Sequence, residues 1–349
     1  MFKTFLKGAA LIALSSVFIC SCGYCSNKNL DILTAFSSQM KKENSLWVGT
    51  FQLVFNDMKN EILKKDVAFK GEKPTKDLNL LNSQEFDKSM LNEESYYTSY
   101  GLTSPEAKKQ IEKDILAKFN EKSSILDTLD WSKGYQKYYA YAMLKKDFEF
   151  PNEFDKLKSA KFNNSKEKFN YFGINEKSSD LLDDNVGVLF YNGKNDYAVR
   201  LYTKNDDIVY LYRTDDSSNF KKQFEKMQTQ SKKFKGNRFF GENDTLMVPN
   251  LKLKDQRNYE ELCNKIIEGT DRMIFSDAIE TIELELNSKG GKVKSEAALM
   301  TRTMSLRHPD TSEGRDFNFD KPFTMFLIDK GKKDPYLAIK VKNLKGINK

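Results

Sequence analysis

The sequence predicts an α+β fold, with N-terminal helices packed on large mixed or antiparallel sheets. Two patterns indicate this class. Apolar residues recur at helical spacing before residue 120, whereas short β-branched or aromatic runs follow from about Tyr135 onward. Aromatic residues make up 13% of the 349 residues, which is enough bulk for a core and excludes wholesale disorder. The formal net charge of +7 is too small over this length to imply a nucleic-acid partner.

The first helix is expected from about Leu46 to Leu63, because Trp47, Phe51, Val54 and later apolar residues share one face. The second is expected to begin at Ser104, a capping residue followed by a first-turn proline. Residues 66–101 between them are polar, and we expect only short helices there. The predicted strands share β-branched or aromatic character and polar or glycine boundaries: Tyr138–Leu144, Val186–Tyr191, Ala198–Tyr202, Ile208–Tyr212, Thr245–Val248, Ile282–Leu286, Phe323–Ile328 and Tyr336–Val341.

The N-terminus carries a targeting signal. Residues 1–21 are predicted to be a signal peptide, since a positively charged start precedes an apolar run, Ala9–Ile19, that is too short to span a membrane. Ile19-Cys20-Ser21-Cys22 resembles a bacterial lipobox, so Cys22 is predicted to carry lipid. Residues 22–31 would then be a lipidated tether, and residues 32–349 one domain. The protein is therefore predicted to be an extracytoplasmic, membrane-anchored lipoprotein; an ordinary cleaved signal with incidental cysteines is the alternative.

The sequence offers little catalytic chemistry. His308 is the only histidine and stands in a polar segment, so a nucleophile activated by histidine would depend on that residue alone. Cysteine and histidine spacings suit no zinc site, and Gly290-Gly291-Lys292 lacks the rest of a phosphate-binding loop. We therefore predict no enzyme, no catalytic residue, no metal and no cofactor. The basic stretch Lys221–Arg238 is interpreted as a solvated helix face and loop, with an anionic polymer partner as the alternative.

The last quarter of the chain contains the most informative segment. A strand with alternating apolar residues is expected to end at Gly290-Gly291, and the segment from there to about residue 316 is long enough to be a functional loop. Its first half nevertheless alternates like a strand, with charged residues between small or apolar ones. We expect this part to be able to enter a sheet, packed inward through Gly291, Val293, Ser295, Ala297 and Leu299.

Several motifs in this region resemble those of serpins, the serine protease inhibitor family. Ser276-Asp277-Ala278-Ile279 and Leu286-Asn287-Ser288-Lys289-Gly290 are similar to the serpin strand that leads into the hinge of the reactive-centre loop. Phe319-Asp320-Lys321-Pro322-Phe323 resembles the motif that follows that loop, and Lys340-Val341-Lys342-Asn343 resembles the closing strand. Phe148-Glu149-Phe150-Pro151 resembles the family's Trp-x-x-Pro turn. The resemblance extends over about residues 33–343, and is strongest from Val248 onward.

The resemblance implies a monomeric suicide inhibitor of serine or cysteine proteases. In this mechanism a protease cuts the loop (about residues 290–316), and the freed segment enters the central sheet and deforms the attached protease. Gly290 and Gly291 would form the hinge. Counting from Gly290 as in the family, the reactive bond is Met304–Ser305, which favours a chymotrypsin-, elastase- or subtilisin-like target. A shifted register would instead offer Arg302 or Arg307 to a trypsin-like enzyme.

Four positions depart from the family pattern. Ser288 replaces a usual glutamate, Glu280 a histidine, Ala140 an asparagine and Phe148 a tryptophan. The polar network that controls opening of the sheet must therefore be rebuilt or absent. The alternative function is a non-inhibitory surface lipoprotein of the same fold that binds a macromolecular partner, with Lys221–Arg238 as the candidate surface.

Overall fold

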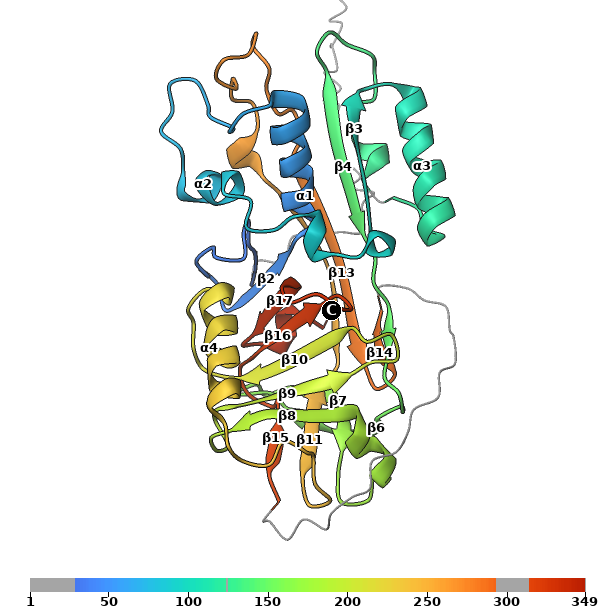
Figure 1. The fold of residues 1–349 in the computed structure, drawn as a ribbon, viewed down its shortest axis with the longest axis vertical. Helices are drawn as coiled ribbons and strands as arrows, with labels where there is room; N and C mark the ends of the chain where they lie inside the picture. Colours follow the sequence, from blue (N-terminus) through green and yellow to red (C-terminus); the bar gives the residue numbers. More distant parts are fainter. Residues whose placement is uncertain (1–28, 124, 293–313, 349) are drawn as a thin grey trace, which may run out of the picture.

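The largest sheet lies in the lower half of the molecule as drawn in Figure 1. The computed structural model describes residues 29–123, 125–292 and 314–348. Its seven-stranded sheet is antiparallel except for the pairing of its first two strands. In spatial order the strands are β1 (Leu30–Ile32), β2 (Asn44–Val48), β17 (Pro335–Val341), β16 (Phe323–Ile328), β10 (Ile208–Arg213), β9 (Tyr197–Tyr202) and β8 (Val186–Tyr191).

Three smaller sheets complete the β structure. The first contains β15 (Asp316–Asn318), β11 (Thr245–Pro249), β7 (Lys168–Ile174) and β6 (Asp155–Lys161). The second contains β12 (Leu251–Asn258), β13 (Ile279–Asn287), β14 (Gly290–Lys292) and β5 (Phe148–Glu149). The third is the hairpin-like pair β3 (Tyr96–Leu102) and β4 (Tyr138–Leu144). In Figure 1, β4 and the upper part of β13 run along the same long direction in the upper half of the molecule.

Most helices lie in the upper half of Figure 1, while one packs against the large sheet. They are α1 (Thr50–Asp57), which continues as the π-helical turn η1 (Met58–Leu63), α2 (Lys76–Asn82), α3 (Pro105–Phe119) and α4 (Phe220–Lys233). Short 3₁₀ turns are η2 (Lys88–Met90), η3 (Glu93–Ser95), η4 (Leu126–Thr128), η5 (Asp180–Asn185), η6 (Glu260–Leu262) and η7 (Leu344–Gly346). Among the described residues, none of the helices has the length and apolar character needed to cross a membrane.

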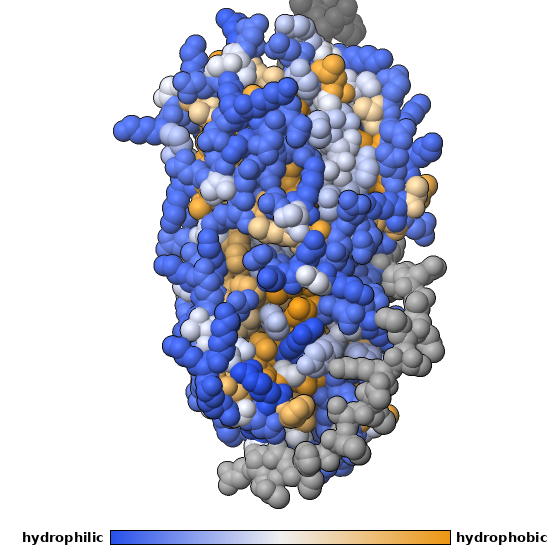
Figure 2. All heavy atoms as spheres, in the orientation of Figure 1, coloured by the Kyte–Doolittle hydropathy of each residue, from blue (hydrophilic) through white to orange (hydrophobic). Residues whose placement is uncertain are grey.

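Buried apolar side chains of the described residues form three separate clusters. The main core lies around the seven-stranded sheet, where every residue of β16 and β17 is buried. A second cluster joins α1 and α2 to η6, and a third lies between α3 and the β3–β4 pair. The exposed face in Figure 2 is mostly hydrophilic, with hydrophobic side chains mainly along its middle. The separation of the second and third clusters matters for the site described below.

The α+β class predicted from the sequence is confirmed by these elements. The second helix begins at its expected cap, where the Ser104 Oγ accepts a hydrogen bond from the Ala107 amide at 3.0 Å. The first helix is confirmed only from Thr50 onward, and the prediction was wrong for Leu46 to Val48, which belong to β2. Every residue of β2 is buried, so its apolar residues continued the helical stripe by coincidence. β3 was missed because its mixed polar and aromatic residues gave no clear alternation.

Two predicted boundaries also differ. Leu30 and Asp31, placed at the end of the tether, form β1 with Ile32. Gly290 and Gly291, expected to end a strand and open an exposed loop, instead form β14 with Lys292 and are buried. A pair of glycines in a sequence usually indicates the end of a strand. Here the glycines continue the sheet, because β5 approaches β14 too closely to leave room for side chains at these two positions.

Candidate functional site: a seam between β4 and β13

The hinge predicted at the paired glycines is a tight hairpin. β13 turns at Ser288 and Lys289 into β14, so that Leu286 pairs with Gly291 and Asn287 with Gly290. On its other edge β14 pairs with β5, with Gly290 opposite Glu149 and Gly291 opposite Phe148. β14 is therefore a three-residue strand between β13 and β5.

Only glycine fits at these two positions. A Cβ atom on Gly290 would lie 2.1 Å from the Phe148 carbonyl oxygen, and the residue has a positive φ of +151°. A Cβ atom on Gly291 would lie 2.2 Å from Cζ of the Phe148 ring. Phe148, which stands where the family has tryptophan, thus covers the hinge directly. The missing side chains let β14 enter the space between its neighbours.

The turn is held by polar contacts with the segment after β5. The Ser288 hydroxyl hydrogen-bonds to Glu153 Oε1 at 3.0 Å, and the Ser288 carbonyl accepts from the Phe154 amide at 2.9 Å. The Phe150 amide donates to the Lys289 carbonyl at 2.9 Å. Glu153 therefore supplies a carboxylate at the turn, where Ser288 replaces the glutamate that is usual in the family. No local pattern indicates this partner, since the two residues are 135 positions apart.

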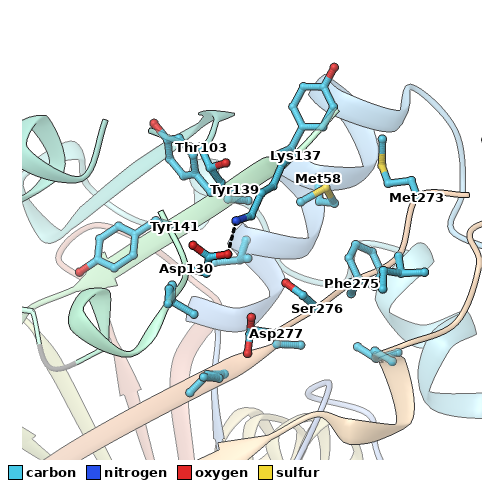
Figure 3. A pocket seen from close by; sticks show the side chains of 18 of the residues that line it. Met58, Thr103, Asp130, Lys137, Tyr139, Tyr141, Met273, Phe275, Ser276 and Asp277 are labelled. Atoms are coloured by element: carbon cyan, nitrogen blue, oxygen red, sulfur yellow. Dashed lines mark hydrogen bonds and ion pairs between the residues drawn. The ribbon is translucent and has the colours of Figure 1, made fainter. Parts of the chain in front are cut away.

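Beyond β14 the two long strands on either side are not paired. β4 is hydrogen-bonded to β3 and β13 to β12, and within the described residues no strand pairing joins β4 to β13. A cavity of about 480 Å³ lies between them, which we call the seam cavity. Its floor includes Phe51, Val54 and Phe55 of α1, and its walls come from β4 and from residues 271–281 (Figure 3).

The seam cavity also lies between two separately packed cores. Phe51, Phe55 and Leu262 on one side belong to the cluster around α1, whereas Trp131 and Tyr141 on the other belong to the cluster beneath α3. These two clusters are not continuous among the described residues, so the seam cavity separates two packed groups of side chains.

A buried carboxyl group lines the seam cavity from β13. Glu280 is only 4% exposed, and Tyr259 donates a hydrogen bond to its Oε2 at 2.7 Å. Phe51 stacks on the Tyr259 ring at 3.7 Å between centroids, and the Arg257 guanidinium lies 4.1 Å from the same ring centroid. Burial raises the pKa of Glu280 to about 7, against the opposing effects of Tyr259 and Arg257. A Glu–Tyr pair therefore stands where the family has its histidine.

A second buried charge fixes the junction between β4 and β5. The Lys146 Nζ lies 2.7 Å from Asp329 and 2.9 Å from Asp207, and all three side chains are at least 90% buried. Burial raises the pKa of Asp207 to about 6, although Lys146 opposes the shift. This network joins the β4–β5 junction to the turn between β9 and β10. The junction therefore stays with the large sheet while β4 itself lines the seam cavity.

The other end of the predicted loop is anchored in a different sheet. Arg315 pairs with Asp244, 2.6 Å from Nη2 to Oδ2, and also donates to the carbonyls of Asn237 and Phe239. Asp316 then begins β15, which runs parallel to β11. The strands that precede and follow residues 293–313, β14 and β15, thus belong to separate sheets (Figure 1).

Most predicted loop positions lie outside the described residues. These are Val293, Ser295, Ala297, Leu299, Arg302, Met304, Ser305 and Arg307, together with the predicted lipidation site Cys22 and His308. The structure brings together Gly290, Gly291 and Phe148, and places Ala140 and Glu280 on the lining of the seam cavity. Sequence reasoning missed Tyr259 and Glu153, since neither stands in a motif. Only their contacts in the folded chain, with Glu280 and with Ser288, reveal them.

Comparison with known proteins gave structural likenesses only. No protein-family model matches the chain, and no curated protein sequence matches it. It is similar in structure to Serpin48, described as a highly specific serpin in the insect Tenebrio molitor, with 11% identity, a TM-score of 0.48 and coverage of 87% of this chain and 93% of the other. It is also similar to thyroxine-binding globulin in complex with thyroxine, with 12% identity, a TM-score of 0.41 and coverage of 68% and 65%. The first of these belongs to the family that the sequence motifs resemble.

Proposed function

We propose that this chain is a serpin-type suicide inhibitor of serine or cysteine proteases, and that its loop, once cut, enters the seam between β4 and β13. One observation supports this above all. β14 is already paired with β13 and β5 at one end of the seam, while the edges of β4 and β13 beyond it share no pairing in the described part of the chain.

The register of β14 supports the predicted inward positions. If the pairing with β13 continued in step, the incoming residues would face the buried side of that strand: Val293 opposite Leu284, Ser295 opposite Ile282, and Ala297 opposite Glu280. Small or apolar side chains would therefore enter the interior, and Lys294 and Glu296 would point to solvent. A shift by one residue would bury the charges instead.

Insertion would supply the energy that traps a protease. The new strand would gain hydrogen bonds along both edges and would bury apolar surface worth about 25 cal/mol per Å². Before cleavage, the chain is tied at β14 and at the Arg315–Asp244 pair, in two different sheets. Full insertion is withheld while both ends stay joined, so the intact form would persist kinetically.

We propose Met304–Ser305 as the bond that is attacked, with Arg302 and Arg307 as the alternatives. A chymotrypsin-, elastase- or subtilisin-like protease would accept the unbranched apolar side chain of Met304. Mass spectrometry of the released fragment identifies the bond directly. Cleavage after Arg302 or Arg307 by the trapped protease would contradict the Met304 assignment.

The inhibitory function is tested by incubation with a panel of these proteases. We expect a covalent complex that survives denaturing gel electrophoresis with at least one of them. Ser295→Arg places a charge on the inward face and should turn inhibitor into substrate, whereas the matched variant Lys294→Arg, on the outward face, should inhibit as before. Equal inhibition by both variants, or no complex across the panel, would contradict the proposal.

The proposal includes attachment to a membrane through lipid on Cys22. Incorporation of radiolabelled palmitate in a bacterial host should depend on that thiol. Cys22→Ala should abolish labelling, and Cys25→Ala should leave it intact.

The alternative, a non-inhibitory lipoprotein that binds an anionic partner, is favoured by one surface. Lys232 and Lys233 at the end of α4 and Lys235 just after it are all exposed. Under this alternative, binding to an anionic polymer such as heparin should fall steeply with salt and disappear when the three lysines are changed to glutamate. Retained binding in that triple variant would exclude this surface.

A further inference from the structure

The seam cavity has the size and walls of a small-molecule site. Its volume of about 480 Å³ lies within the range of ligand pockets, roughly 300–1,000 Å³. Its lining is rich in aromatic rings, among them Phe51, Phe55, Trp131, Tyr139, Tyr141 and Phe275. Such walls favour a flat apolar or aromatic molecule, and their ring faces also attract cations.

The charges around the seam cavity favour a cation. Its lining contains four acidic side chains (Asp130, Asp271, Asp277 and the buried Glu280) but only two basic ones (Lys137, Arg272), although the whole chain has a net charge of +7. Lys137 is engaged with Asp130 at 2.5 Å. Figure 3 shows Asp277, from the β13 side, projecting into the space opposite that ion pair. Within the described residues Asp277 has no ion pair, so its charge is available at the mouth.

A buried polar atom at the inner end adds to this preference. Glu280 Oε1 accepts no hydrogen bond of ordinary geometry from the described residues, although the Phe51 backbone lies near enough to favour the ionised form. A buried oxygen without a hydrogen-bond donor is stabilised when a ligand brings a donor or a positive charge close to it.

We propose that the seam cavity binds a small aromatic amine, with its ring against the aromatic walls and its ammonium group among the carboxylates of Asp277, Asp130 and Glu280. Binding itself does not depend on the inhibitory function. One consequence does rest on the proposed function: the amine would occupy the space into which the cut loop inserts, and would therefore slow trapping of the protease.

The binding test uses phenethylamine as the probe and 2-phenylethanol as its neutral analogue. Trp131 lines the cavity, whereas Trp47 lies in β2, so a Trp47→Phe chain reports on the cavity through one tryptophan. We expect phenethylamine to change this fluorescence saturably and to bind about tenfold more tightly than the alcohol, as a charge-assisted contact requires. Calorimetry on the unmodified chain should give the same dissociation constant.

Variants locate the ligand. Asp277→Asn, at the exposed mouth, should weaken phenethylamine binding severalfold and leave 2-phenylethanol unaffected. Val54→Trp should fill the floor and abolish binding of both probes, whereas the control Glu283→Gln, also on β13 but at an exposed position, should change neither. Equal affinity for amine and alcohol, or amine binding that survives Val54→Trp, would overturn the proposal.

The regulatory consequence is measured separately, with a protease that forms the complex. Saturating phenethylamine should shift the outcome from complex toward cleaved chain, and 2-phenylethanol at equal concentration should not. An unchanged yield of complex despite measured binding would overturn the regulation. Failure to form any complex without amine would instead contradict the proposed inhibitory function.

Discussion

At the scale of single residues, the hinge depends on the absence of side chains at Gly290 and Gly291. The Phe148 ring occupies the position where a Cβ on Gly291 would lie, and the Phe148 carbonyl blocks Gly290 in the same way. Two conditions meet here, a positive φ and a close approach, and glycine alone satisfies both. This explains why a residue pair that usually ends a strand forms one.

Gly291→Val should therefore expel β14 from between β13 and β5. We expect a loss of about 1–3 kcal/mol in the free energy of unfolding, as for overpacked cores. Hydrogen exchange at Gly290 and Lys292 should accelerate in the same variant. The control Lys289→Ala changes an exposed turn residue and should leave exchange at β14 unchanged; fast exchange in the control, or slow exchange in Gly291→Val, would argue against the close contact.

The raised pKa of Glu280 makes the free energy of unfolding depend on pH, and the direction of this dependence can be derived. Burial raises its pKa to about 7 in the folded chain, above its ordinary value of 4.5. Between these two values the folded chain holds a proton that the unfolded chain has lost. The free energy of unfolding should consequently fall as pH rises from about 4.5 to 7, by up to about 3 kcal/mol, and be insensitive to this group at higher pH.

Glu280→Gln isolates this effect, because it keeps the shape and hydrogen-bonding capacity but cannot ionise. Urea unfolding from pH 4.5 to 8 should show a smaller decline in this variant than in the wild type. Asp207, whose pKa is also raised by burial, contributes equally to both proteins and cancels in the difference. Parallel curves for the two proteins would show that Glu280 titrates normally.

At the scale of secondary-structure elements, the seam is defined by which strand edges are paired. Among the described residues β4 is paired only with β3, whereas β13 is paired with β12 along its length and with β14 at its C-terminal end. α1 forms the floor across both strands. The edges of β4 and β13 and the covering helix α1 would therefore already be in place for an incoming strand. The conformational entropy lost on insertion would then be mainly that of the inserted strand.

Cutting the chain within residues 293–313 should change these edges selectively. We expect amides of β4 and β13 that face the seam to become more protected from hydrogen exchange after cleavage, because a new strand would bond to them. Amides of β8 and β9, which are paired in the same sheet before and after, serve as the internal control. Unchanged protection at β4 and β13 would mean that the cut loop stays outside.

At the scale of the whole molecule, the proposed mechanism depends on the two ends of the loop being held in different sheets until the chain is cut. β14 belongs to the sheet of β12 and β13, and β15 belongs to the sheet of β11. Because the loop connects strands of two different sheets, it could not insert fully into the seam while the chain is uncut. The stability of the intact protein would then be partly kinetic.

Nicking at the loop should raise the melting temperature well above that of the intact chain. At an unfolding entropy of about 2 cal/mol/K per residue, every gain of about 3 kcal/mol in the free energy of unfolding raises the melting temperature of a chain of this size by roughly 4 °C. Calorimetry of the intact chain and of the nicked, unseparated chain gives the comparison, and nicked Ser295→Arg serves as the control that should not gain. An identical melting temperature for the nicked wild type would contradict insertion.

Several elements could be predicted from sequence because their pattern and boundaries coincide. β4, β8 and β16 begin and end as expected, since each is a short aromatic or β-branched run between polar residues. α3 begins at its Ser104 cap for the same local reason. By contrast, β2 was assigned to a helix because complete burial removes the alternation that distinguishes a strand.

The α+β class and the strand-like alternation after Gly290 could be derived from the chain alone, because they depend on residue types and on their spacing. The packing of distant segments places the paired glycines in a sheet against Phe148, brings Glu280 to Tyr259, and encloses a cavity between β4 and β13 above α1. These features depend on contacts between segments far apart in sequence. Such contacts follow from how the sheets pack, which no local pattern encodes.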